Sequence, residues 1–153
     1  MIDPDETEPQ RLARNLAELL QELRVAQNGV QVLFGFLLTL AFTERYGSAG
    51  DLVHVVHVVT TSLAAASAAF LIAPAAWHRI LFRHGHREQI IRWASVSALV
   101  GLILLAAAMT GTVLMIGYVV FGGLFGALLA SGFGLLFLML WFIMPLWMRI
   151  SPR

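Results

Sequence analysis

The chain has 153 residues, of which 59% are hydrophobic and 12% are charged, and its formal net charge is +1. The charged share is about half that of a typical soluble domain, so the composition excludes a soluble globular protein and indicates one all-α integral membrane domain. The chain contains no Cys, which excludes disulfide bonds and thiolate metal sites.

The N-terminal region combines a polar tail with a helix start. Residues 1–7 are acidic and hold nothing that can be buried, so we expect a disordered tail. Thr7 as N-cap, Gln10 three residues later and Pro9 in the first turn predict that a helix starts here. Residues 8–24 then alternate apolar and charged side chains at helical spacing, which predicts an amphipathic helix on the cytoplasmic side.

This helix is expected to continue through a first transmembrane span at 25–43, giving one helix over 12–42. Amides interrupt the apolar run and share one helical stripe with a preceding arginine: Arg24, Gln27, Asn28 and Gln31. Two interpretations are open. The stripe lines a pore on a ring of identical helices, with Glu44 at its outer mouth, or its amides hydrogen-bond to neighbouring helices, which is the commoner use of amides in spans.

The second span is expected at about 52–74 and carries His54 and His57 on one face near its start. Two histidines three residues apart can sense pH or relay protons. The alternative, which we favour, is a pair at the interface that only begins the helix.

From Trp93 to Met148 no charged residue occurs, and this length suits two spans, at about 92–113 and 120–146, with a turn between 111 and 123. The last span carries small residues at every fourth position: Gly122, Gly126, Ala130 and Gly134. Such a ridge lets another backbone approach closely. Its partner is either the third span, where Ser97 and Gly101 offer a similar surface, or a second subunit.

The arginines predict the orientation. With four spans, nine of the ten lie at the end of the protein that carries both termini, and only Arg45 lies at the other: Arg11, Arg14, Arg24, Arg79, Arg83, Arg87, Arg92, Arg149 and Arg153. Positively charged residues stay on the cytoplasmic side, so we expect a four-helix bundle in the bacterial inner membrane with both termini in the cytoplasm.

Two stretches, 22–39 (residues 22–25 and 29–39) and 72–79, resemble an uncharacterised family of small four-span membrane proteins found mainly in actinobacteria. The likeness extends from about residue 16 onwards. It implies the four-span topology and a bacterial inner membrane, and it implies no activity.

No set of catalytic residues, resident metal site or cofactor motif is apparent, so we expect neither an enzyme nor a cofactor. The basic segment near the third span has no nucleic-acid-binding motif, so the expected partners are the lipid bilayer and other protein chains. Two functions remain open: a structural or accessory protein that forms an oligomer or joins a larger membrane complex, and a homo-oligomeric channel or transporter lined by the first span.

Overall fold

The computed structural model describes residues 7–81 and 87–150, and among these residues every regular element is a helix. The acidic tail at 1–6 and Arg83 and Arg153 lie outside the described residues. The elements, in chain order, are α1 (Glu8–Leu40), α2 (Glu44–Gly47), α3 (Asp51–Leu81), α4 (Arg87–Phe121), α5 (Gly123–Leu138), the π-helical turn η1 (Met139–Ile143) and α6 (Met144–Ile150).

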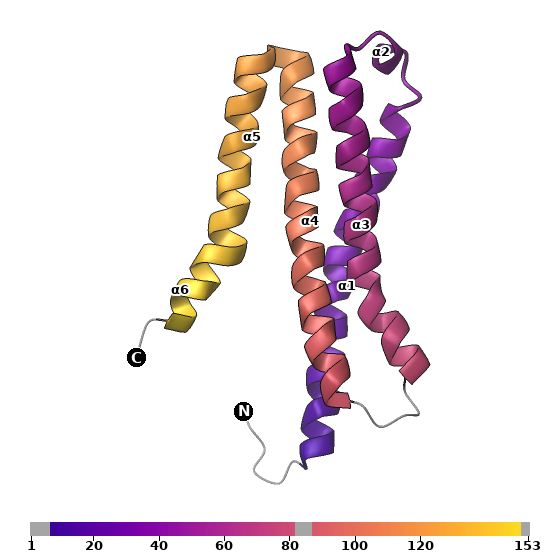
Figure 1. Cartoon of the computed structure of the whole chain (residues 1–153), viewed down its shortest axis with the longest axis vertical. Coiled ribbons are helices and arrows are strands. Elements are labelled where there is room, and N and C mark those ends of the chain that lie inside the picture. Colours follow the sequence, from indigo (N-terminus) through magenta and orange to yellow (C-terminus); the bar gives the residue numbers. More distant parts are fainter. Residues whose placement is uncertain (1–6, 82–86, 151–153) are drawn as a thin grey trace.

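Four segments of the described chain are long and apolar enough to cross a membrane, which confirms the predicted number of spans: Arg14–Leu40, Asp51–Ile80, Ile91–Phe121 and Gly123–Ile150. Successive spans run in opposite directions (Figure 1). The start of α1 and the end of α6 therefore lie at one end of the molecule, called the terminal end below. The other end, which carries α2 and the connection between α4 and α5, is called the turn end.

Helix α1 begins where the sequence supplies partners for its first free N–H groups. The Gln10 side-chain oxygen accepts hydrogen bonds from the backbone N–H and the hydroxyl of Thr7, each at 2.9 Å. A proline lies in the first turn, where its missing N–H leaves no bond unmade. The helix then buries one residue in every seven against the rest of the chain: Leu16, Leu23, Val30 and Leu37.

The end of α1 is tighter than an α-helix. The N–H of Phe42 donates to the Thr39 carbonyl and that of Thr43 donates to the Leu40 carbonyl, both at 3.1 Å and both three residues apart. Such bonds are common where a helix terminates. The helix ends at Leu40, so the predicted end at residue 42 is wrong by two residues and Phe42 belongs to the turn.

The four long helices of the predicted bundle form an open arrangement. Helices α1, α3 and α4 contact one another, and α3 and α4 share the largest contact. Helix α5 packs on α4, on the side away from α1 and α3, and then diverges from it towards the terminal end (Figure 1). Within α5 only Gly126 and Ala130 are buried, so most of this span faces the surroundings.

The turn between the last two long helices lies at Gly122, whose φ of +90° is a conformation that side chains other than glycine rarely adopt. It falls inside the predicted interval of 111–123, but α4 extends eight residues beyond the predicted end of the third span at 113. Gly111 does not break this helix. It lies where α3 comes so close that an added Cβ atom would overlap the Thr60 hydroxyl.

Pro145 explains the π-helical turn η1. A proline has no N–H, so the Trp141 carbonyl four residues earlier has no α-helical donor. The chain accommodates this with a wider turn, in which the N–H of Met144 bonds to the Met139 carbonyl five residues earlier. The helix axis bends here, and α6 points away from the line of α5 (Figure 1).

Candidate functional site

A second proline creates a polar contact among three helices. Pro74 is buried inside α3 and leaves the Phe70 carbonyl without its helical donor. The Ser97 hydroxyl of α4 donates to this carbonyl at 2.7 Å. The Gln27 side-chain amide of α1 donates to the neighbouring Leu71 carbonyl, also at 2.7 Å. We call this group of five residues the proline node; it satisfies backbone oxygens of α3 with side chains from α1 and α4.

The predicted polar stripe on α1 is therefore divided. Gln27 bonds to another helix of the same chain. Arg24, Asn28 and Gln31 have exposed side chains, and none of them makes a hydrogen bond or ion pair with the described residues. One turn beyond them lies Gly35, where an added Cβ atom would meet nothing within 4 Å. The stripe thus contains one internal contact and one free polar surface.

Ser97 and Gly101, which the sequence suggests as a surface for the last span, face α3 instead. Ser97 joins the proline node, and the Gly101 carbonyl accepts a 2.7 Å hydrogen bond from the buried Ser67 hydroxyl. A Cβ atom at Gly101 would lie 2.7 Å from the Leu71 side chain. These small residues let α3 and α4 pack closely and leave α5 to use another part of α4.

The small-residue ridge of α5 contacts α4 near the turn end. A Cβ atom at Gly126 would lie 2.5 Å from the Tyr118 nitrogen and 2.9 Å from the Gly117 carbonyl carbon, so the two backbones approach directly. Ala130 is buried one turn later, and Gly134 lies beside the Thr110 side chain. Gly122 serves the turn itself. In this structure the ridge packs within one chain.

The two predicted histidines meet a tyrosine from α2. The His57 ring is 5% exposed, and its Nε2 lies 2.8 Å from the Leu37 carbonyl in the last turn of α1. Because a carbonyl only accepts, Nε2 carries the hydrogen, and the Tyr46 hydroxyl lies 3.0 Å from Nδ1 as its donor. His54 Nε2 donates to the Tyr46 carbonyl at 2.9 Å. The Tyr46 ring contacts both imidazoles edge-on, with ring centroids 4.6 and 4.8 Å apart.

This His–Tyr cluster, Tyr46 with His54 and His57, closes the connection between α1 and α3. It fastens α2 to the first turns of α3 and supplies a donor to a carbonyl at the end of α1, where helical donors run out. Both nitrogens of His57 are occupied by these contacts. These contacts leave His57 no free ligand position and make the cluster a structural connection between α1, α2 and α3.

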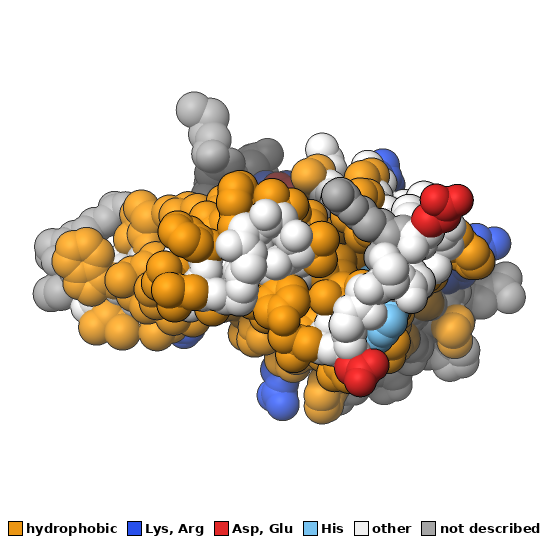
Figure 2. Space-filling view, turned by 90° about the horizontal axis from the view of Figure 1, so that it is seen from above, with side chains coloured by type: hydrophobic (Ala, Val, Ile, Leu, Met, Phe, Trp, Pro, Cys, Tyr) orange, Lys and Arg blue, Asp and Glu red, His pale blue; other side chains and the backbone are white. Residues whose placement is uncertain are grey.

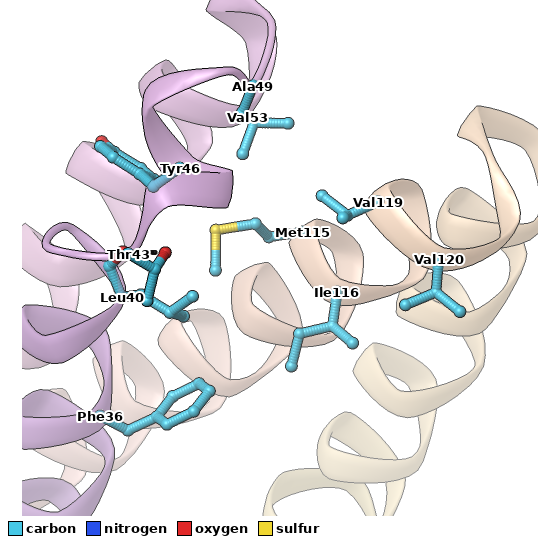
Figure 3. Close-up of a pocket in the computed structure, with 10 residues that line it drawn as sticks. All are labelled: Phe36, Leu40, Thr43, Tyr46, Ala49, Val53, Met115, Ile116, Val119 and Val120. Carbon is cyan, nitrogen blue, oxygen red and sulfur yellow. Dashed lines mark hydrogen bonds between the residues drawn. The ribbon is translucent and has the colours of Figure 1, made fainter.

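Beside the cluster lies an apolar recess of about 200 Å³ at the turn end. It is formed by the end of α1, the connection to α3 and the last turns of α4, and Figure 3 shows Met115 and Phe36 pointing into the space between these elements. Tyr46 and Thr43 supply its few polar atoms.

The turn end itself is sparsely charged. Figure 2 shows mostly hydrophobic side chains, with acidic groups and a histidine over one half of this face. Glu44, predicted at the mouth of a pore, is exposed in the first turn of α2. No group of three or more His, Asp or Glu side chains able to hold a metal ion occurs in the part of the chain that the structure describes.

Sequence reasoning named Gln27, Ser97, His54 and His57 without their partners. Pro74 carried the missing signal, because a proline inside an apolar helix leaves a backbone oxygen free and so requires a donor from elsewhere. The sequence also does not show that Tyr46 contacts both histidines. No sequence signal shows which of the three amides lies beside α3, since that depends on how α1 is rotated.

No curated protein and no solved structure matches the chain at a significant level. One family matches residues 5–145, which include all four candidate spans as far as the start of α6. Since the match covers most of the chain, the protein belongs to the family of unknown function DUF6328.

Proposed function

We propose that this protein is a non-enzymatic subunit of a membrane assembly, and that it binds its protein partner through the free polar surface of α1. The observation that carries this proposal is the exposure of Asn28 and Gln31 on a membrane-spanning helix without any hydrogen-bond partner in the described chain. Lipid hydrocarbon offers neither donors nor acceptors, so another protein surface is the remaining partner at this depth.

The depth follows from helix geometry. Helix α1 ends at Leu40, and polar residues begin three positions later at Thr43, so we take Leu40 as one boundary of the hydrocarbon layer. Gln31 lies nine residues before this end, about 14 Å at 1.5 Å per residue, and Asn28 lies about 18 Å from it. A hydrocarbon core about 30 Å thick therefore places both amides near its middle. Arg24, at about 24 Å, is close enough to the far boundary for its guanidinium to reach the headgroups.

The energy available from these two amides suits assembly. Hydrogen bonds between membrane helices contribute on average about 0.6 kcal/mol and at most about 1.7 kcal/mol each. Two such bonds, at about 1 kcal/mol each, change an association constant by roughly thirtyfold. That is enough to favour a bound state among helices already confined to one bilayer.

The arginines support the orientation of this subunit. Arg79, Arg92 and Arg149 lie in helical segments at the terminal end, together with the first turns of α1 (Figure 1). By the positive-inside rule this end faces the cytoplasm, with the protein in a bacterial cytoplasmic membrane. The proposal assigns no cofactor and no nucleic acid to the chain.

The experiment compares amides that face different surroundings. The protein is placed in lipid nanodiscs or mild detergent, and its mass is measured by native mass spectrometry. We expect Asn28→Leu with Gln31→Leu to reduce the assembled fraction by about thirtyfold at limiting concentration, while the chain stays folded. Gln27→Leu is the matched control, because it changes the internal amide and should lower stability before assembly. A wild-type protein that is monomeric and unaccompanied in its native membrane would exclude the proposal.

A second candidate function is a homo-oligomeric channel lined by α1, which the same exposed polar surface favours. Two exposed apolar side chains oppose it, Leu38 of α1 at 45% exposed and Phe42 of the following turn at 89% exposed. Both would narrow the path near the turn end, before Glu44. Flux of K⁺, Na⁺, Cl⁻ and H⁺ into liposomes distinguishes the two functions. Selective flux that is lost in a folded Gln31→Leu variant would support the channel. The absence of flux in every gradient would exclude it.

A further inference from the structure

The free surface of α1 has a second regularity beyond its polarity. Six residues follow one another at alternating intervals of three and four, and every one of them is exposed: Gln21, Arg24, Asn28, Gln31, Gly35 and Leu38. We call this row the α1 seam. Alternating intervals of three and four are the spacing of the a and d positions through which two parallel helices form a coiled coil.

The seam is separate from the surface that α1 uses within its own chain. That surface is the row of buried residues seven apart, including Val30 and Leu37, each 0% exposed. At 100° per residue the seam is centred about 120° around the helix from this row. Helix α5 lies on the far side of α4 from α1, so it leaves the seam unobstructed (Figure 1).

The occupant of the seam follows from symmetry. All copies of a membrane protein enter the bilayer in one orientation, so the α1 helices of two copies are parallel. In a parallel two-fold pair, each a or d residue faces the same residue of the other helix. Only a side chain that both donates and accepts can hydrogen-bond to its own kind, and the amides of Asn and Gln do both.

We propose that two copies of this chain pair through the α1 seam as a parallel two-fold coiled coil, in which Asn28 and Gln31 each hydrogen-bond to the same residue of the second copy. This inference rests on the proposed function, since it names the partner that the polar surface of α1 binds. A single buried Asn at an a position is known to select register and oligomeric state in coiled coils.

The remaining seam residues are compatible with this pairing. Gly35 follows the amides, and a Cβ atom there would meet nothing within 4 Å, so a second helix can approach closely at that level. Leu38 adds an apolar layer. Arg24 would face a like charge, but it lies close to the boundary of the hydrocarbon layer, where its long side chain can turn outward to anionic headgroups. From Gln21 to Leu38 the seam is about 26 Å long, close to the thickness of the hydrocarbon layer.

Disulfide cross-linking in membranes tests the pairing, because the chain has no Cys of its own. Each variant carries one Cys and is oxidised in native-like lipid. Gly35→Cys and Leu38→Cys place identical thiols opposite each other across the two-fold axis. Gly29→Cys and Phe36→Cys are the matched controls, since both positions are exposed on α1 but lie off the seam. We expect about tenfold more disulfide-linked dimer from the seam positions, because only they bring two Cα atoms within about 7 Å.

A second measurement depends on no thiol. A Cβ atom at either Gly29 or Gly35 meets nothing within 4 Å in the single chain. We therefore expect Gly35→Leu to reduce the dimer fraction at least about tenfold, and Gly29→Leu to leave it unchanged.

Equal cross-linking at all four positions would indicate random collision and would overturn the pairing. Assemblies that Asn28→Leu and Gln31→Leu abolish, without cross-links at the seam, would also overturn it and leave the proposed function standing with a different partner. Seam cross-links that persist undiminished in the Asn28→Leu, Gln31→Leu background would overturn the role of the amides. A monomer insensitive to every change would overturn the inference and the proposed function together.

Discussion

The proline node makes a quantitative prediction about Ser97 and Pro74. Ser97→Ala removes the donor that satisfies the Phe70 carbonyl, and Pro74→Ala restores an N–H that can bond to the same carbonyl within α3. The two changes should therefore interact. Ser97→Ala should be costly while the proline is present and nearly neutral once it has been replaced.

The size of the effect comes from the burial of the acceptor. Ser97 is 3% exposed, and Pro74 is among the fully buried side chains. A buried acceptor without a donor costs about 1–3 kcal/mol in soluble proteins, and hydrogen bonds between membrane helices contribute about 0.6 to 1.7 kcal/mol. We expect Ser97→Ala to lower the free energy of unfolding by about 1 kcal/mol, a fivefold change in the equilibrium. The coupling energy with Pro74→Ala should be of the same size.

The assay is reversible unfolding in mixed micelles of a mild detergent and sodium dodecyl sulfate, followed by the fluorescence of the four tryptophans. The four proteins of the double-mutant cycle are measured together. Ser95→Ala is the control, because the Ser95 hydroxyl bonds to the Ile91 carbonyl of its own helix and is exposed. If the two changes add to within about 0.3 kcal/mol, the Ser97 hydroxyl does not replace the N–H that Pro74 lacks.

Three further changes test the other contacts. Gly126→Ala should destabilise the protein by about 1–3 kcal/mol in the same unfolding assay, because the new Cβ atom meets backbone atoms of α4. Gly132→Ala is the control and should have no such effect, because a Cβ atom there meets nothing within 4 Å. Equal effects of the two changes would contradict the close approach of α4 and α5. Tyr46→Phe should speed proteolysis between residues 41 and 50, because it removes the hydrogen bond to His57 that holds α2. An unchanged cleavage rate would show that the ring contacts alone hold α2 in place. Pro145→Ala should convert η1 to an α-helix, because it restores a donor to the Trp141 carbonyl. This conversion should change the distance between spin labels on α4 and α6. An unaltered distance would mean that packing, and not the proline, maintains the bend.

Much of the helical framework could be predicted from the sequence, because it depends on local composition. Four apolar stretches and an all-α fold follow from length and hydrophobicity, and the structure has both. The end of α4 was harder to predict. Gly111 resembles a break in the sequence, but it serves as a contact for Thr60, and only the position of α3 distinguishes these roles.

The candidate site was predictable in its residues and not in their partners. The stripe of amides on α1 is a consequence of helical periodicity, yet only Gln27 reaches α3. Its difference from Gln31 is a matter of how far α1 is rotated, which depends on packing along its whole length. The position of α5 could not be predicted either. A ridge of small residues indicates that a helix will approach another closely, but it does not indicate which surface the helix approaches.

The bond from Gln27 to the Leu71 carbonyl also affects how the protein enters the membrane during synthesis. Helix α1 emerges from the ribosome before α3, and it is the least hydrophobic of the four candidate spans. Its internal amide finds an acceptor only after about 44 further residues have been made, when α3 arrives beside it. The first span should therefore become stable in lipid only when it is paired with α3 as a helical hairpin. Its release from the translocon should wait for α3.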